Sequence, residues 1–511
     1  MRSMLRCAGG FVPAVVFVIA VLLIVPLGTV FEFDRDEGLN LMKAALLKEG
    51  MPLYSAIWSD QPPLLTTALA GLFKVTGNSV GAARGLMLAV SAIGLLSIAC
   101  ILRMTAGWVA AFAGVGLLAL SNEYVRLSVA VMIGLPALSL ALAAIALALA
   151  GARRGSWSLI VFSGVVMGVS MQTKLFTFMA VPWVLLLIGL TFRRPDDGAK
   201  RQAARSFGAV GAWVGGFAVV FVGVGLYFGS LNYELLIHSH VRDKVEAAQH
   251  RPTAQMLREF AKWDWEHHLL AGVGLIGAVA RRRWVRLLPA AWFATAVAVM
   301  SNHRPVWDDH YVLFSIPLSW LAAYAVADAI ELLRPRARTR GAFERAGAKR
   351  PGSARSSARD LLRRPILLRI AAALPAVALL ACVAWRVPAK AQRWDVRKMP
   401  HTDLSGSAKV VREMQKRGTP TGWVFTDRPI YAFYAGRRVP PEVAVISAKR
   451  FHSEALTRAD LIALVKRYGP EQIVLARFLR TDMAFRFWLL ITYSKEVEDR
   501  GVMLFEPRGR K

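Results

Sequence analysis

Apolar runs long enough to cross a membrane recur along most of this 511-residue chain. The hydrocarbon core of a bilayer is about 30 Å thick, and a helix of roughly 20 apolar residues crosses it. With 55% hydrophobic residues and a mean hydropathy of +0.42, the chain is also far more apolar than a soluble protein of this length. The sequence therefore predicts a polytopic α-helical membrane protein.

The apolar runs give about eleven predicted spans. They are residues 11–30, 83–104, 108–120, 127–150, 158–171, 175–192, 207–228, 263–280, 284–300, 311–332 and 366–385. Residues 64–75 are apolar as well, but Lys74 interrupts them and Pro62-Pro63 precedes them, so a helix lying in the membrane interface is the better prediction. The first span is longer than a signal-peptide core and lacks a small-residue cleavage site, which favours an uncleaved anchor.

The net charge of +30 would suit a nucleic-acid-binding protein, but the distribution of the basic residues points elsewhere. They collect in turns on one side of the predicted spans, at Arg153-Arg154, Arg193-Arg194 and Arg281-Arg282-Arg283, and above all in residues 333–365. Positive loops lie on the cytoplasmic side of membrane proteins. We therefore predict a cytoplasmic N-terminus, a disordered basic cytoplasmic loop over 333–365 that contacts anionic membrane lipids, and no nucleic-acid partner.

The last quarter of the chain, residues 386–511, is mixed in polarity and differs from the preceding transmembrane module, residues 1–385. Residues 422–425 and 472–475 resemble strands, and a Thr-x-x-Asp capping pattern at Thr457 and Asp460 predicts a helix over 457–468. An odd number of spans places this tail on the side opposite to the N-terminus. The sequence thus predicts a small extracytoplasmic α/β domain.

An acidic patch follows the first predicted span, in a first outer loop that we assign to residues 31–82. Its residues are Phe33-Asp34-Arg35-Asp36-Glu37-Gly38. It could be an ordinary acidic loop, but carboxylates at the mouth of a membrane span are costly unless they have a function. One carboxylate next to another tends to have a raised pKa, which suits a general base. Asp34, Asp36 and Glu37 could also hold Mg²⁺ or Mn²⁺ through oxygen ligands.

Two cations and two histidines are further candidates. Arg84 begins the second predicted span and Lys174 lies at an outer turn, where positive charge is disfavoured; each could extend to the interface or bind a lipid phosphate. His303 and His310 flank a short outer loop whose aromatic residues could simply belong to an interfacial belt. Their spacing matches no established metal motif, which argues against a metal site. His238 and His240, in another outer segment, have a similarly weak claim as metal ligands and are expected to be polar lining.

The order of several short motifs resembles the type C membrane glycosyltransferases. These motifs are Asp36-Glu37, Gly50-x-Pro52-Leu53-Tyr54, Gln61-Pro62-Pro63, Gly77-Asn78-Ser79, Ala83-Arg84 and Gln172-Thr173-Lys174. The most similar group is family 39, with the protein O-mannosyltransferases and the bacterial aminoarabinose transferases of lipid A. The resemblance extends from Met1 to about Phe228, weakens through the later spans and is loose in the tail.

This resemblance implies an inverting enzyme of the bacterial inner membrane that moves a sugar from a polyprenyl-phosphate donor to a lipid, glycan or protein acceptor at the outer face. By analogy Asp36 is the base, Glu37 is its catalytic neighbour and Lys174 holds the donor phosphate. Asp34, Arg84, Tyr54, Gln61, His303 and His310 are the other expected substrate-binding residues. Relatives commonly have an acidic residue near the start of the fourth span, where this chain offers only the earlier Glu123.

A transporter or flippase of lipid-linked sugars is the alternative function. It would need charges inside the spans, whereas the notable charges here lie at the outer mouth.

No nucleotide-binding glycine loop is present, which is consistent with a lipid-linked donor. No cofactor is certain, and a divalent cation is the one that the residues suggest.

Overall fold

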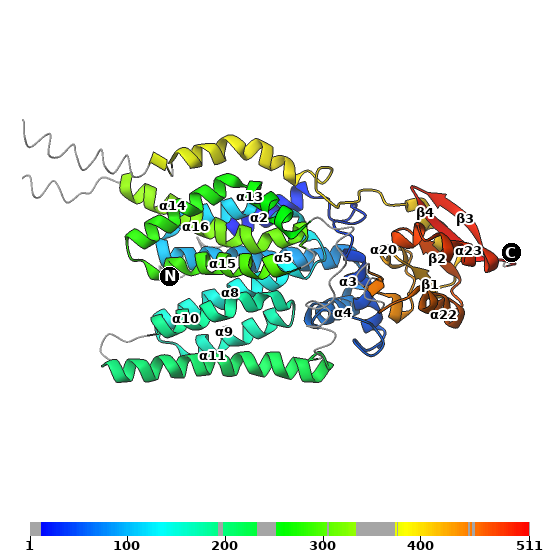
Figure 1. The fold of residues 1–511 in the computed structure, drawn as a ribbon, viewed down its shortest axis with the longest axis horizontal. Coiled ribbons are helices and arrows are strands. Elements are labelled where there is room, and N and C mark those ends of the chain that lie inside the picture. Colours follow the sequence, from blue (N-terminus) through cyan, green and yellow to red (C-terminus); the bar gives the residue numbers. More distant parts are fainter. Residues whose placement is uncertain are drawn as a thin grey trace, which may run out of the picture.

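The computed structural model describes residues 12–192, 198–231, 252–303, 306–333, 374–375, 377–447, 450–451 and 455–509. A bundle of apolar helices forms one end of the molecule and a small α/β domain forms the other, with α3 (Glu37–Lys48) and α4 (Leu64–Thr76) between them (Figure 1). The predicted basic loop, apart from Leu333, and the candidates His238 and His240 lie outside the described residues.

The bundle confirms the predicted polytopic α-helical class. Five of its helical stretches are long and apolar enough to cross a membrane, among the residues described: Val80–Ala106 (α5), Gly134–Arg154 (α8), Ala199–Phe228 (α11), Trp284–Asn302 (with α15, Leu288–Asn302) and Asp308–Leu333 (with α16, Val312–Leu333). Shorter apolar helices accompany them: α2 (Val12–Ile24), α6 (Trp108–Ala119), α9 (Trp157–Met171), α10 (Val181–Thr191) and α14 (Trp265–Ala280). Helix α16 lies at the centre, since almost all of its side chains are buried.

One predicted span is wrong in its bounds. Residues 127–150 are two helices, α7 (Tyr124–Val129) and α8, separated by extended backbone at Ala130. The short helix α7 carries the buried Arg126, which pairs with acidic residues at the end of the bundle nearest the small domain. Because those partners lie outside the apolar part of the bundle, α7 belongs to that end and α8 alone is the span.

The predicted helix over 64–75 is α4, whereas α3 was not predicted. Helix α3 has apolar and polar residues on all sides, and it is nevertheless buried over Glu37–Leu46. It is covered by the bundle on one side and by helix α20 (Ile430–Tyr434) of the small domain on the other (Figure 1). Its sequence therefore lacks the one-sided pattern of a surface helix.

The small domain contains a four-stranded sheet in the order β1-β2-β4-β3. Strand β1 (Val424–Thr426) is parallel to β2 (Gln472–Leu475), while β4 (Val502–Pro507) is antiparallel to β2 and to β3 (Tyr493–Asp499). Helices α19 (Ala408–Arg417), α20, α22 (Arg458–Tyr468) and α23 (Met483–Thr492) accompany the sheet. The predicted capping box of α22 is present, with Thr457 Oγ1 accepting from the Asp460 N–H.

The first outer loop and the small domain share one hydrophobic core. The Phe31 ring stacks on Tyr434 with 5.0 Å between centroids, and Phe73 lies 5.7 Å from Phe433. Gly38 lets α3 approach α20 closely, because a Cβ atom there would lie 2.7 Å from the backbone nitrogen of Ile430. The two parts are therefore packed against each other as one body.

Buried charges anchor the segment that leads into the small domain. The Lys390 ammonium, at the end of the helical residues 377–391, lies 2.8 Å from Asp264 Oδ1 and 2.5 Å from Glu266 Oε1. Asp264, Glu266 and His267 are close enough together to suggest a metal site, but Lys390 already supplies the cation among them. We assign this cluster to anchoring, since a buried ammonium needs such partners.

Candidate active site

The acidic patch lies at the start of α3, between the bundle and the small domain. Its three carboxylates have different surroundings: Glu37 is fully buried, Asp34 is largely buried, and the Asp36 side chain is 52% exposed. The structure thus separates three residues that the sequence places together, and each has its own partner.

Glu37 is paired with Arg84, and both side chains are completely buried. Arg84 Nε and Nη2 donate to the two carboxylate oxygens of Glu37 at 2.9 and 2.8 Å. The same guanidinium donates to the carbonyl oxygens of Leu27, Val30 and Phe31. Glu37 and Arg84 therefore satisfy each other and hold the start of the outer loop against α5, which favours a structural role over contact with a substrate.

Asp34 and Glu123 share Arg126, a residue that the sequence analysis missed. Arg126 Nη1 donates to Asp34 Oδ2 at 2.6 Å, and its Nε donates to Glu123 Oε2 at 2.7 Å. Glu123 adopts a left-handed backbone conformation, with φ of 65°. The signal was available in the sequence, because Arg126, like Lys174, is a cation on the predicted outer side of the spans, where positive charge is disfavoured.

Asp36 is the most accessible of the three carboxylates. Its one ion-pair partner in the described ranges is Arg477 of the small domain, with 3.7 Å between Asp36 Oδ1 and the guanidinium Nη1. Desolvation by the surrounding protein and, second, the charge of Asp34 raise the pKa of Asp36 to about 6. An accessible carboxylate with such a pKa is suited to accept a proton near neutral pH.

The patch does not fit the predicted Mg²⁺ or Mn²⁺ site. Within the described part of the chain, the one group of three or more acidic, histidine or cysteine side chains with ligand atoms in mutual reach is the Lys390 cluster. Asp34 and Glu37 each bind an arginine instead. A hard divalent cation needs several convergent oxygen ligands, and these three carboxylates do not converge.

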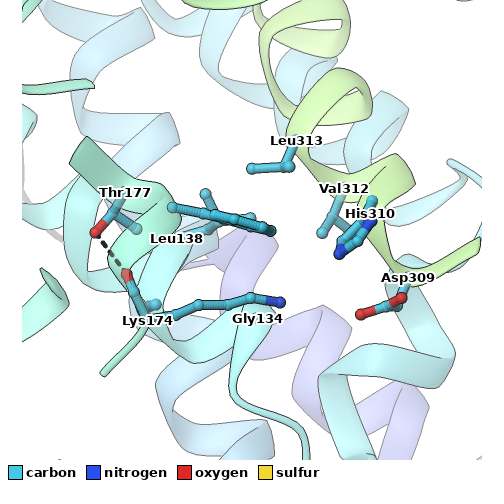
Figure 2. Close-up of a pocket in the computed structure, with 10 residues that line it drawn as sticks. Gly134, Leu138, Lys174, Thr177, Asp309, His310, Val312 and Leu313 are labelled. Atoms are coloured by element: carbon cyan, nitrogen blue, oxygen red, sulfur yellow. Dashed lines mark hydrogen bonds between the residues drawn. The ribbon is translucent and has the colours of Figure 1, made fainter. Parts of the chain in front are cut away.

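Lys174 lies in a pocket formed by three parts of the bundle, the start of α8, the turn after α9 and the start of α16. Figure 2 shows its ammonium pointing toward Asp309 and His310 across this pocket, while its carbonyl oxygen accepts from Thr177. The Lys174 Nζ atom lies 5.1 Å from the centre of the Phe176 ring. Among the described residues, this ammonium forms no salt bridge, and the opposite charge that it faces across the pocket is Asp309. The ammonium is therefore available to an anion that enters the pocket.

Asp309 connects this pocket with Asp36. It lines the pocket of Lys174, and its charge also contributes to the raised pKa of Asp36. The structure therefore brings a candidate base and a candidate phosphate-binding cation to the same end of the bundle.

The two predicted histidines lie in contact with each other at this pocket. The ring centroids of His303 and His310 are 5.4 Å apart, and both rings lie edge-on to Phe176. His310 Nδ1 accepts the backbone N–H of Trp307 at 3.1 Å. His310 lines the pocket of Lys174 and His303 packs against it, and their predicted role in substrate binding stays a prediction.

Tyr54 and Gln61 join two segments of the outer loop. The Tyr54 hydroxyl donates to the Gln61 carbonyl oxygen at 2.9 Å, and the Gln61 amide donates to Asp60 Oδ1 at 3.2 Å. The loop is tied to the turn that carries Lys174, because the Leu64 N–H donates to the Gln172 carbonyl oxygen at 3.1 Å. Tyr54 and Gln61 thus stabilise the loop internally, and the Leu64–Gln172 bond places it beside the turn of Lys174.

Lys43 is a second candidate that the sequence analysis missed. It lies on α3 seven residues after Asp36, on the same face of the helix, and is 4% exposed. Desolvation lowers its pKa, while the charges of Asp60 and Asp36 oppose that effect. The sequence alone does not show that Lys43 is buried near Asp36, because the residues that surround it come from distant segments of the chain.

Comparison with known proteins supports the resemblance drawn from the motifs. Residues 60–196 match the model of the dolichyl-phosphate-mannose-protein mannosyltransferase family. No curated protein matches the chain by sequence.

Two groups of solved structures share the fold. ArnT from Cupriavidus metallidurans in the apo state is 15% identical, with a TM-score of 0.60 over 96% of this chain and 97% of that chain. The structure of the same ArnT bound to undecaprenyl phosphate has a TM-score of 0.57 over the same shares, also at 15% identity. The apo oligosaccharyltransferase of Archaeoglobus fulgidus is 11% identical, with a TM-score of 0.50 over 91% of this chain and 69% of that chain. The predicted likeness to type C membrane glycosyltransferases is thereby confirmed.

Proposed function

We propose that this chain, which has the fold of the type C membrane glycosyltransferases, is an inverting glycosyltransferase. It transfers a sugar from a polyprenyl-phosphate-linked donor to a lipid, glycan or protein acceptor. The observation that carries the proposal is that one end of the bundle holds both a candidate base and a candidate cation. The Asp36 carboxylate is accessible and its pKa is raised to about 6, and the Lys174 ammonium faces a pocket, lined in part by Asp309, without forming a salt bridge to any residue that the structure describes.

The residues support a single displacement at the anomeric carbon. Asp36 accepts the proton of the acceptor hydroxyl while the acceptor oxygen forms a bond to that carbon. The bond between the anomeric carbon and the phosphate oxygen breaks, and its electron pair stays on the phosphate. Lys174 stabilises the charge of the leaving phosphate, and attack from the opposite face inverts the configuration.

The comparisons support the donor class. One similar structure holds undecaprenyl phosphate, and the matching family is named for dolichyl-phosphate mannose. Both are sugar carriers or carrier-linked sugars with a lipid phosphate, and a lysine ammonium that faces a pocket can recognise such a phosphate.

Transfer by purified protein tests the function. The protein is incubated in detergent or liposomes with radiolabelled sugars linked to polyprenyl phosphate, together with extracted envelope lipids, glycans or proteins as acceptors. We expect label on one acceptor class and release of polyprenyl phosphate. Movement of intact donor across a liposome membrane, without release of the phosphate, would instead support the flippase alternative.

We further propose that the small domain lies outside the cytoplasm of a bacterial inner membrane, since this orientation places every basic turn inside. A reporter fused after Lys511 that is active only outside the cytoplasm should be active. Activity of a reporter specific for the cytoplasm would show that a span has been miscounted.

Lys174→Ala should raise the donor KM, or lower kcat, by tenfold or more with little change in the acceptor KM. The reason is that the ammonium contacts the donor phosphate and no acceptor group. Steady-state kinetics with each substrate varied in turn gives the values, and Lys48→Ala is the matched control, because Lys48 bonds Asn78 at the exposed end of α3. If the donor KM and kcat of the variant are unchanged, Lys43 becomes the candidate for binding the donor phosphate, because Arg84 is already paired with Glu37.

A further inference from the structure

One side chain of the small domain, Arg477, lies next to the candidate base Asp36. Arg477 follows β2 by two residues, and its guanidinium lies 3.7 Å from Asp36. Strands β1 and β2 are parallel, so their carboxyl ends lie at the same edge of the sheet. That edge faces the start of α3.

The loop that carries Arg477 is fixed from within the domain. Asp427, directly after β1, is completely buried and accepts the backbone N–H groups of Ala476, Arg477 and Leu479 at 2.8, 2.9 and 2.9 Å. Three hydrogen bonds to one buried carboxylate hold the loop in a single conformation. The backbone of Arg477 is thus set by the sheet.

The edge of the domain is also fixed against the outer loop. Arg428, next to Asp427, donates through Nε to the buried Glu32 at 3.0 Å and through Nη2 to Asp403 at 3.1 Å. Together with the contact of Gly38 with Ile430, these bonds set the position of the sheet relative to α3. The approach of Arg477 to Asp36 therefore follows from the docking of the whole domain.

We propose that Arg477 is a positioning residue of the transfer site, which orients the Asp36 carboxylate and favours its ionised form. This inference rests on the proposed function of Asp36. The other charges that act on Asp36 come from two segments: Asp34 and Asp60 lie on the outer loop, and Asp309 lies in the turn just before α16. Lys43 faces it from α3.

The sign of the effect follows from these charges. The three carboxylates disfavour ionisation of Asp36, and Arg477 opposes them. Removal of the guanidinium should raise the pKa of Asp36 further, so that the acidic limb of the activity profile moves to higher pH. An arginine beside an aspartate typically shifts the pKa by about 1–3, and solvent exposure at both side chains favours the lower end.

The test compares the pH profiles of three variants in the full chain. For Arg477→Gln we expect the acidic limb of kcat/KM, near pH 6 in the wild type, to move up by roughly one pH unit. Activity at pH 6 should then fall several-fold, with recovery at pH 8 and an unchanged donor KM. Arg477→Lys should keep most of the wild-type profile, and Arg467→Gln, on the exposed face of α22, should not change it.

A second measurement keeps the inference separate from the function. Infrared titration of the carboxylate bands, taken as wild type minus Asp36→Asn, reports the ionisation of Asp36 without any transfer reaction. The same subtraction in the Arg477→Gln background should show a higher midpoint. An unchanged midpoint overturns the role of Arg477 even if transfer is observed; a shifted midpoint without any transfer activity supports the pairing and overturns the proposed function instead.

Discussion

Asp36→Asn lowers kcat for sugar transfer by about 10²-fold or more, while the protein still inserts and folds. The expectation follows from the loss of the group that accepts the acceptor proton, since general-base catalysis contributes about 10²–10⁴-fold. Asparagine keeps the size of the side chain and cannot take up the proton. Single-turnover transfer with a saturating donor measures the chemical step directly.

The control is Glu49→Gln, which removes an exposed carboxylate at the other end of α3 and should leave kcat unchanged. Gel filtration and the thermal midpoint of both variants show whether the fold is kept. A turnover of Asp36→Asn within a few-fold of the wild type would remove Asp36 from the mechanism.

Arg84→Met is expected to destabilise the protein by about 3–5 kcal/mol, because it leaves the buried Glu37 carboxylate without its partner. It also removes the donor to the Leu27, Val30 and Phe31 carbonyl oxygens. Thermal unfolding in detergent, followed by the loss of the monodisperse peak, measures the change.

The matched control is Arg103→Met on the same helix, since Arg103 contacts the Trp108 ring near the end of α5 and no carboxylate in the described part of the chain. The double variant Glu37→Gln/Arg84→Met should be less destabilised than the sum of the single changes. If Arg84→Met kept the wild-type thermal midpoint but raised the donor KM, Arg84 would bind substrate, as the sequence first suggested.

The sequence was sufficient for the class of fold, whereas the location of the transfer site stays a prediction. Long apolar runs are a strong signal because every backbone polar group in a bilayer must be satisfied by helices, and the five long apolar helices of the described residues overlap predicted spans. The capping box at Thr457 and Asp460 and the strands near 424 and 472 depend on local chemistry, and they too were predicted correctly in position. The acidic patch and Lys174 lie at the same end of the bundle, as the motifs implied.

The sequence could not assign different roles to neighbouring carboxylates. Asp34, Asp36 and Glu37 differ through Arg126, Arg477 and Arg84, which are between about 50 and 440 residues distant in the chain. Only the tertiary fold brings these cations to their partners. Helix α3 was missed for the same reason, since it is covered on both sides by segments far away in the sequence.

The long-range pairing of Glu32 with Arg428 has a consequence for how the protein is made. These two residues are 396 positions apart, and their pairing lies beside the hydrophobic core that the first outer loop and the small domain share through Phe31, Phe73 and Phe433. At a synthesis rate of about 5–20 residues per second, the loop waits roughly 20–80 s for its partner. During that interval Phe31, Phe73 and the buried Glu32 have no cover from the small domain. The outer loop therefore completes its fold only after the small domain has been synthesised, and a nascent chain truncated before that domain would leave the candidate active site unfinished.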